Sequence, residues 1–430
     1  MTLFLGTFLD TPDDPFAGGA LRSVAAGALL VLDGEIVERG AADALRSTHP
    51  QEEVVDLSGG LVLPGFVDTH VHFPQVRMIG ALGRPLLDWL EHSALPEEAR
   101  LADTAYAGDV ATEFLAGLTS AGTTTALVFG AHFPAAVEVL FTRAAEVGLR
   151  MTTGLVVSDR ILRPDLLTSP QTAYDDGLAL AKRWHGVGRN RYAVIPRFSL
   201  SCTEGLLDSC AALLDAVEDS WLTSHINENL AEVAAVRGLF EDCTDYLTSY
   251  DRHRLVGARS VFAHNVHTTP AELEVLGQHG AGVAHCPTSN AALGSGMFPL
   301  RAHVEHGVRV ALGSDVGGGT GFSLFKEGLQ AYFVQQLLGE RGLALSPSHL
   351  LHLATSAGAR MLGLAEEVGD FSIGKQFDAL WLRPRDGTPL DVGLRHADGP
   401  SDSLGKVFAM GTPADVARVY IAGEPIAGSE

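Results

Sequence analysis

Short β-rich runs alternate with longer helix-like stretches after Leu61, and this alternation constrains the fold more than any other feature of the chain. The candidate strands are Leu61–His70, Thr123–Phe129, Arg150–Val157, Tyr192–Phe198, Trp221–Ile226, Ser260–His264, Ala281–His285 and Val308–Ser314. Apolar residues recur every three or four positions in the stretches between them, which predicts helices over Thr104–Ala121, Ala135–Val147, Thr203–Val217, Pro270–His279 and Leu324–Leu338. Eight such units predict an α/β protein with a TIM-type (β/α)8 barrel.

The two ends of the chain have a different pattern. Gly27–Glu38 predicts a β-hairpin that turns at Asp33-Gly34, and Asp378–Leu382 and Ala417–Ile421 predict further strands near the C-terminus. We therefore expect a small β-sandwich domain to which both termini contribute strands.

Length and composition fit a barrel with such an appendage. Apolar residues make up 46% of the 430 residues and charged residues 19%, which is typical of a globular chain. The expected division is residues 1–60 for the N-terminal part of the small domain, 61–365 for the barrel and 366–430 for the C-terminal part of the small domain.

Charge, cysteine content and hydropathy indicate which partners and which cellular compartment to expect. The formal net charge of −22, without a cluster of Lys and Arg, disfavours a nucleic-acid partner. The four cysteines have no C-x-x-C spacing, which favours a reducing compartment. Met1–Phe16 carries no basic residue before its apolar run, and no later segment approaches 18 uninterrupted apolar residues. These features predict a cytoplasmic protein without a membrane partner.

Metal-compatible side chains follow several of the predicted strands. His70 and His72 end the first strand one residue apart, so both point to the same face of it. His225, His264 and Asp315 end or follow three further strands. The active sites of TIM barrels are assembled at this C-terminal rim. Three or four nitrogens with one carboxylate suit Zn²⁺, or Fe²⁺ as a second choice, and leave a position for water.

Five motifs, in this order, carry a resemblance to a known family. They are Pro64–Gln75, Pro196–Cys202, His225–Asn229, Ala284–Asn290 and Gly313–Gly318. The chain resembles the amidohydrolase superfamily, and within it most closely the guanine deaminases. The motifs cover the barrel, whereas the terminal β-domain matches more loosely.

The resemblance implies a mononuclear zinc site with His70, His72, His225 and Asp315 as ligands. The strand Tyr192–Phe198 has no lysine that could bridge a second metal, which agrees with one ion per chain. The resemblance also suggests a homodimer that acts on a small-molecule purine.

The expected reaction is the hydrolysis of guanine to xanthine and ammonia. Zinc lowers the pKa of a bound water from about 15.7 towards about 7, so that a metal-bound hydroxide can attack C2. Asp315 would accept the water proton, Glu228 would protonate N3, and His264 would steady the attacking oxygen. A Glu at this place could instead only stabilise the start of a helix, because negative charge is favourable there.

Four further residues are expected to bind the substrate. Gln75 offers a donor and an acceptor to an amide-like ring edge, and Arg197 can donate to O6. Phe198 would stack on or wall the purine, and Trp89 would close the pocket. The alternative roles are a surface ion pair for Arg197 and a place in the hydrophobic core for the two aromatic residues.

Three other functions compete with guanine deamination. A related aminohydrolase acting on 8-oxoguanine, isoguanine, a pterin or an s-triazine would use the same metal and acid. A non-catalytic scaffold would keep the barrel, but the loss of chemistry normally removes metal ligands, which are all present here. A nucleic-acid-editing zinc deaminase needs a P-C-x-x-C motif, which this chain lacks.

Overall fold

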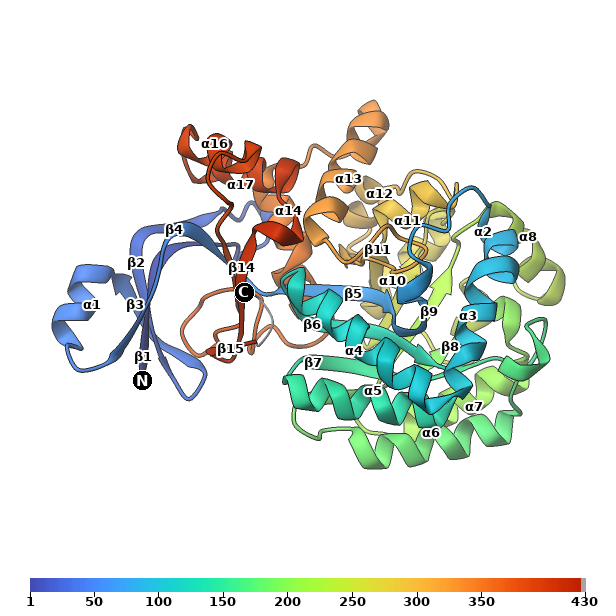
Figure 1. Cartoon of the computed structure of the whole chain (residues 1–430). Helices are drawn as coiled ribbons and strands as arrows, with labels where there is room; N and C mark the ends of the chain where they lie inside the picture. Colours follow the sequence, from blue (N-terminus) through green and yellow to red (C-terminus); the bar gives the residue numbers. More distant parts are fainter. Residues whose placement is uncertain (427–430) are drawn as a thin grey trace.

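The computed structural model describes residues 1–426 and consists of a barrel and a smaller β-domain beside it (Figure 1). The N-terminus lies in the small domain, and the chain returns to that domain after the barrel is complete. This arrangement confirms the predicted α/β fold with a TIM-type barrel and a small β-domain built from both termini.

The barrel is an eight-stranded parallel sheet in which strands are neighbours in chain order. Its strands are β5 (Phe66–His72), β6 (Thr123–Ala131), β7 (Arg150–Val157), β8 (Asn190–Pro196), β9 (Trp221–Ile226), β10 (Ser260–His264), β11 (Gly282–His285) and β12 (Arg309–Leu312). The segment after β12 returns to β5, because Asp315 N donates to His70 O at 2.8 Å and His72 N donates to Val316 O at 3.2 Å. The last unit of the barrel is thereby joined to the first.

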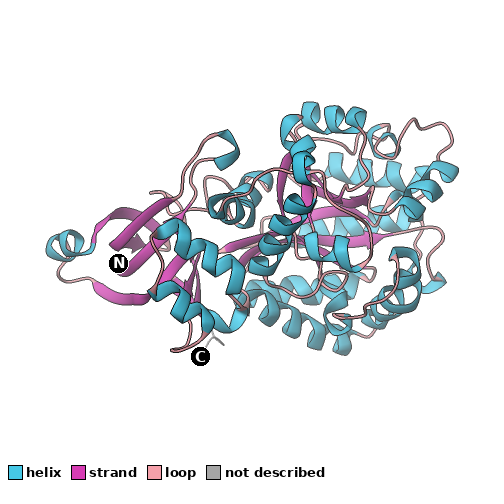
Figure 2. Ribbon diagram, turned by 90° about the horizontal axis from the view of Figure 1, so that it is seen from above, coloured by secondary structure: helices cyan, strands magenta, loops and turns pink. Residues whose placement is uncertain are grey.

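Helices surround the barrel strands (Figure 2). They are α2 (Leu86–Trp89), α3 (Leu95–Ala99), α4 (Thr104–Ser120), α5 (Pro134–Val147), α6 (Pro170–Trp184), α7 (Glu204–Ala216), α8 (Leu230–Leu239), α9 (Thr248–Asp251), α10 (Pro270–His279), α11 (Pro287–Ala292), α12 (Leu300–Glu305), α13 (Leu324–Leu337), α14 (Pro347–Ala354) and α15 (Ser356–Met361). All five predicted helices form, and α10 begins with the capping box of Thr269 and Glu272. Within residues 1–426, no helix combines the length and apolar character needed to cross a membrane.

The small domain contains one seven-stranded sheet, and its strands are not divided between two separate sheets. Its strands are β1 (Thr2–Asp10), β2 (Arg22–Leu32), β3 (Glu35–Ala41), β4 (Glu53–Pro64), β13 (Ala379–Leu382), β14 (Val416–Ile421) and β15 (Glu424–Pro425), with α1 (Ala42–Thr48) between β3 and β4. The predicted hairpin is β2–β3, with Leu32 opposite Glu35. The predicted C-terminal strands are β13 and β14, and β13 pairs with β4.

The predicted strand Leu61–His70 is wrong, because two strands divide it. β4 ends at Pro64 in the small sheet and β5 begins at Phe66 in the barrel. A side chain on Gly65 would place its Cβ 2.2 Å from Thr124 Oγ1, so the chain passes very close to β6 at this point. β4 crosses the expected domain boundary at residue 60, and we propose that the small domain extends to Pro64.

Two helices lie between the C-terminal strands, where the sequence analysis predicted none. They are α16 (Pro389–Arg395) and α17 (Pro400–Met410). α17 packs against α13 and α14 of the barrel. The segment between β13 and β14 therefore covers part of the barrel.

A glycine at the centre of the barrel wall gives a test of this packing. A Cβ on Gly154 in β7 would lie 1.9 Å from Ala193 O, which is backbone and cannot move aside. We expect Gly154→Ala to destabilise the protein by about 1–3 kcal/mol or more. Gly108 in α4 has open space around it, so Gly108→Ala should stabilise by about 0.5–1 kcal/mol. Thermal unfolding midpoints measure both, and equal midpoints for the two variants would contradict this account.

Candidate active site

A cavity at the C-terminal end of the barrel strands contains the residues that the sequence analysis selected. Its lining consists of His72, Gln75, Leu86, Trp89, Leu90, Arg197, Phe198, His225, Glu228, His264, Leu293 and Asp315. His70 is the one selected residue outside this lining, and it is fully buried beside His72 and His225. The structure thus brings all the predicted site residues together.

A cluster of three histidines and one aspartate lies at one side of the cavity. His70, His72 and His225 each offer a ring nitrogen within 4.8 Å of the others. Asp315 Oδ1 lies 3.3 Å from His70 Nε2 and 3.2 Å from His72 Nε2. His72 Nε2 and His225 Nε2 are 3.2 Å apart.

These separations fit the ligand shell of a metal ion. A tetrahedral zinc with ligands about 2.0–2.1 Å away holds them about 3.3–3.4 Å from one another. His225 donates from Nδ1 to the carbonyl of Arg197 at 2.6 Å, which leaves the lone pair of Nε2 directed at His72. Within residues 1–426, both nitrogens of the buried His70 also lack a hydrogen-bond partner. A cation among these atoms would satisfy His70 Nε2 and would separate the facing lone pairs of His72 Nε2 and His225 Nε2.

The protonation states of these residues favour metal binding. Burial lowers the pKa of His72 to about 4, and it lowers the pKa of His70 and, more strongly, that of His225. The three imidazoles are therefore neutral near pH 7, as metal ligands must be. Burial alone would raise the pKa of Asp315, but His70 and His72 lower it well below its usual range, so the carboxylate is ionised.

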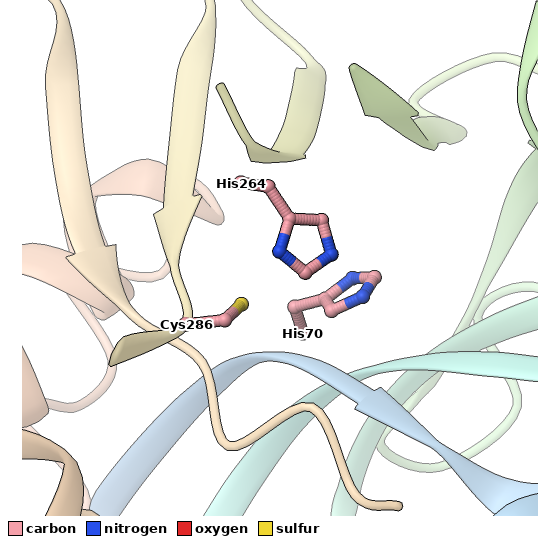
Figure 3. Close-up of side chains that lie close together, drawn as sticks. All are labelled: His70, His264 and Cys286. Carbon is pink, nitrogen blue, oxygen red and sulfur yellow. The ribbon is translucent and has the colours of Figure 1, made fainter. Parts of the chain in front are cut away.

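A second cluster shares His70 and contains a thiol. His264 and Cys286 each place a ligand atom within 4.8 Å of His70, and Figure 3 shows the thiol directed towards the two imidazole rings. Burial raises the pKa of Cys286 well above its usual value, so the thiol stays protonated. Because the thiolate is the form that binds metals, the cluster of His70, His72 and His225 is the better candidate.

Glu228 and His264 lie side by side in the cavity lining. His264 Nε2 is 3.5 Å from Glu228 Oε2 and 3.8 Å from Asp315 Oδ2. Asn290 accepts from His264 Nδ1 at 2.9 Å and fixes the orientation of the ring. Burial, together with the charges of Glu232 and Asp315, raises the pKa of Glu228 well above its usual value. This shift favours the protonated carboxyl of Glu228, whose Oε1 has no partner within residues 1–426.

A buried carboxylate that the sequence analysis missed, Glu98, lies behind the predicted substrate-binding residues. Gln75 Nε2 donates to Glu98 Oε1 at 2.8 Å, and Arg197 Nη1 donates to Glu98 Oε2 at 3.0 Å. His132 Nε2 lies 3.3 Å from the same oxygen. Burial opposes ionisation, but the charge of Arg197 and the neighbouring His132 lower the pKa of Glu98 to about 2. Arg197 is thus paired inside the protein and is not a surface ion pair.

A second missed residue, Asp68, holds the loop that carries Asp315. Asp68 accepts from the backbone and hydroxyl of Ser314 and from the backbone of His70. It thereby ties β5 to the segment after β12. Asp68 stands two positions before His70 in the first strand, but only the barrel closure brings it to Ser314, so no local pattern marks it.

Comparisons with known proteins agree with this geometry. The family model described as "Amidohydrolase family" matches residues 61–426. A probable guanine deaminase of Deinococcus radiodurans is 59% identical over 429 residues, which cover 98% of each chain. The solved structure of E. coli guanine deaminase superposes with a TM-score of 0.96 at 35% identity and covers 100% of both chains.

A further solved structure is guanine deaminase from C. acetobutylicum with bound guanine in the active site. It superposes with a TM-score of 0.91 at 26% identity and covers 99% of both chains. The resemblance that the motifs indicated is confirmed. The chain belongs to the amidohydrolase family, and within it this chain groups with proteins named guanine deaminases.

Proposed function

We propose that this protein is a zinc-dependent guanine deaminase that hydrolyses guanine to xanthine and ammonia. The observation that carries the proposal is one cavity that combines a metal-compatible cluster, a protonated acid and a donor–acceptor pair for the purine. Full-length relatives named guanine deaminases support it. A cytoplasmic location, a homodimer and the absence of nucleic-acid and membrane partners stay predictions.

His70, His72, His225 and Asp315 would hold the ion. Their neutral nitrogens and single carboxylate suit zinc, with Fe²⁺ as the second choice. When bound, zinc would lower the pKa of a coordinated water from about 15.7 towards about 7. The second oxygen of Asp315, Oδ2, faces His264 and is free of His70 and His72, so it can accept a proton from the attacking water.

Glu228 supplies the other proton of the reaction. Its carboxyl protonates N3 of guanine while the water oxygen forms a bond to C2 and loses its proton to Asp315. The proton on Asp315 then passes to the amino group, the C2–N bond breaks and ammonia leaves. The remaining hydroxyl proton returns to Glu228, which leaves xanthine. His264, next to both carboxyl groups, orients the attacking oxygen.

The opposite side of the cavity would bind the purine. Gln75 and Arg197 present hydrogen-bond donors and an acceptor that fit O6 and N1 of guanine. Phe198 and Trp89 line the cavity as aromatic walls. These roles place C2 towards the metal cluster and Glu228.

The first test measures guanine turnover. Purified, zinc-loaded protein should consume guanine and release ammonia, and Glu228→Gln should lower kcat by about 10²–10⁴-fold because it removes the acid. The exposed Glu241→Gln serves as a control and should retain full activity. A metal-loaded wild-type protein without turnover would reject guanine and favour 8-oxoguanine, isoguanine, a pterin or an s-triazine.

Metal content tests the ligand set independently of the substrate. Elemental analysis should find close to one zinc per chain in the wild-type protein. His225→Ala should bind much less metal, because it removes one ligand and its link to Arg197. His306→Ala changes an exposed histidine outside the cluster and should bind as much metal as the wild type. Iron in place of zinc would overturn the metal assignment, and an unchanged content in His225→Ala would overturn the ligand set.

The substrate-binding role of Gln75 has its own measurement. Gln75→Ala should raise KM for guanine about 10- to 100-fold, since a site built to hydrogen-bond its substrate loses a donor and an acceptor. Its metal content should stay at the wild-type value, because Gln75 is not part of the metal cluster. Steady-state kinetics in which KM does not change would remove Gln75 from the substrate site.

A further inference from the structure

Glu98 lies behind the cavity and does not line it. The residue is 2% exposed, and the two cavity residues that it contacts, Gln75 and Arg197, are 1% and 3% exposed. Its two oxygens receive the Gln75 amide, the Arg197 guanidinium and the neighbouring His132. One buried carboxylate therefore touches both residues that would read the purine.

The carboxylate fixes which way round the Gln75 amide lies. An ionised carboxylate can only accept hydrogen bonds, so the nitrogen of Gln75 must face Glu98. On its other side, the Gln75 oxygen accepts from the backbone N–H of Gly317 at 3.3 Å, and this group can only donate. Both neighbours enforce the same orientation. The amide keeps one free N–H on its nitrogen and one free lone pair on its oxygen. The positions of this donor and this acceptor are therefore fixed for a ligand.

The same carboxylate holds the charge of Arg197. The Arg197 Nη1 atom lies 3.0 Å from each oxygen of Glu98, so one end of the guanidinium is occupied. Burying an unpaired guanidinium would be very unfavourable. Pairing at one end keeps Arg197 inside the protein and leaves its other donors for a ligand.

Glu98 also belongs to the segment that carries an aromatic wall. Trp89 ends α2, a π-helical turn spans Leu90–Ala94, and α3 follows with Glu98. Trp89 lines the cavity and Glu98 anchors the other end of this segment to Arg197. Glu98 thus links the segment that carries Trp89 to Gln75 and Arg197.

We infer that Glu98 is a positioning residue that sets the donor–acceptor pattern with which Gln75 and Arg197 recognise the O6–N1 edge of the purine. This inference rests on the proposed function, because it assumes a purine that carries a carbonyl at C6. Glu98 acts only through the two residues that it holds. A purely structural ion pair would stabilise the fold without affecting substrate recognition.

Steady-state kinetics of Glu98→Gln test the inference. Glutamine has the same shape but brings a donor of its own and no charge, so only the Gly317 N–H still orients Gln75 and Arg197 loses its anionic partner. We expect kcat/KM for guanine to fall about 10- to 100-fold, mostly through KM, because misplacing binding groups weakens substrate binding. Bound metal per folded chain should stay unchanged. Glu97→Gln is the matched control, since Glu97 sits on the same helix and bonds to Arg100 and Tyr106 instead.

Glu98→Asp keeps the test decisive if Glu98→Gln fails to fold. Aspartate retains the charge beside Arg197 but is one methylene too short to hold both partners, so it should fold and still raise KM. Either folded Glu98 variant with a wild-type KM would overturn the inference. Loss of thermal stability alone would also do so, because it indicates a merely structural pair.

A double-mutant cycle shows whether Glu98 works through Gln75. In a Gln75→Ala background, the substitution Glu98→Gln should lower kcat/KM by a much smaller factor than it does in the wild type, because one of the two residues that Glu98 positions is gone. A full, additive loss would contradict the inference. Wild-type turnover of guanine in the same assays reports on the proposed function separately. An inactive wild type would overturn both the proposed function and the role of Glu98. An active wild type whose Glu98 variants have the same KM would overturn only the role of Glu98.

Discussion

The seam between the first and last strands of the barrel is the contact on which the site depends. Asp315 N donates to His70 O, and Asp68 binds both the backbone and hydroxyl of Ser314. These bonds bring His70, from the beginning of the barrel, beside Asp315, from its end. Burial raises the pKa of Asp68 to about 7, and its hydrogen bonds from Ser314 and His70 oppose that rise. Without the seam, the histidine pair and the carboxylate would have no common centre.

Burial then gives similar groups different roles. Glu228 and Glu98 are both buried carboxyl groups near one cavity. Glu228 is beside His264, and its burial and the charges of Glu232 and Asp315 raise its pKa and favour the protonated form, whereas Glu98 is paired with Arg197 and is ionised. One can therefore donate a proton to a purine, and the other can only accept hydrogen bonds from its partners. The two pKa values differ because the charges next to the two carboxyl groups differ, as is typical of catalytic sites.

Much of the fold could be predicted because the barrel repeats one pattern. Strands β7, β9 and β10 begin and end where the sequence indicated, since each is a short β-rich run between helical stretches. Side chains at strand ends, such as His225 and Asp315, could be found because all parallel strands end at the same rim. The resemblance, and not the spacing alone, separated the ligands from His264.

Some strands and residues were predicted wrongly or missed because contacts distant in sequence determine them, and local patterns do not show such contacts. Gly65 divides the run Leu61–His70 because its backbone must pass against Thr124, a contact distant in sequence. Pro96-Glu97-Glu98 looks like the ordinary acidic start of a helix, and only the packing of α3 buries the second glutamate against Arg197. β1 escaped notice because its pairing partners, β2 and β4, are set by the sheet and not by its own sequence.

The proposed metal site and substrate orientation are tested most directly by a crystal structure of the zinc-loaded Glu228→Gln protein with guanine. We expect one ion bound by His70, His72, His225 and Asp315. We also expect guanine in the cavity with C2 towards that ion, N3 beside residue 228 and O6 beside Arg197. Guanine bound in the reverse orientation or outside the cavity, or an ion held by His264 and Cys286 instead, would contradict the proposed site.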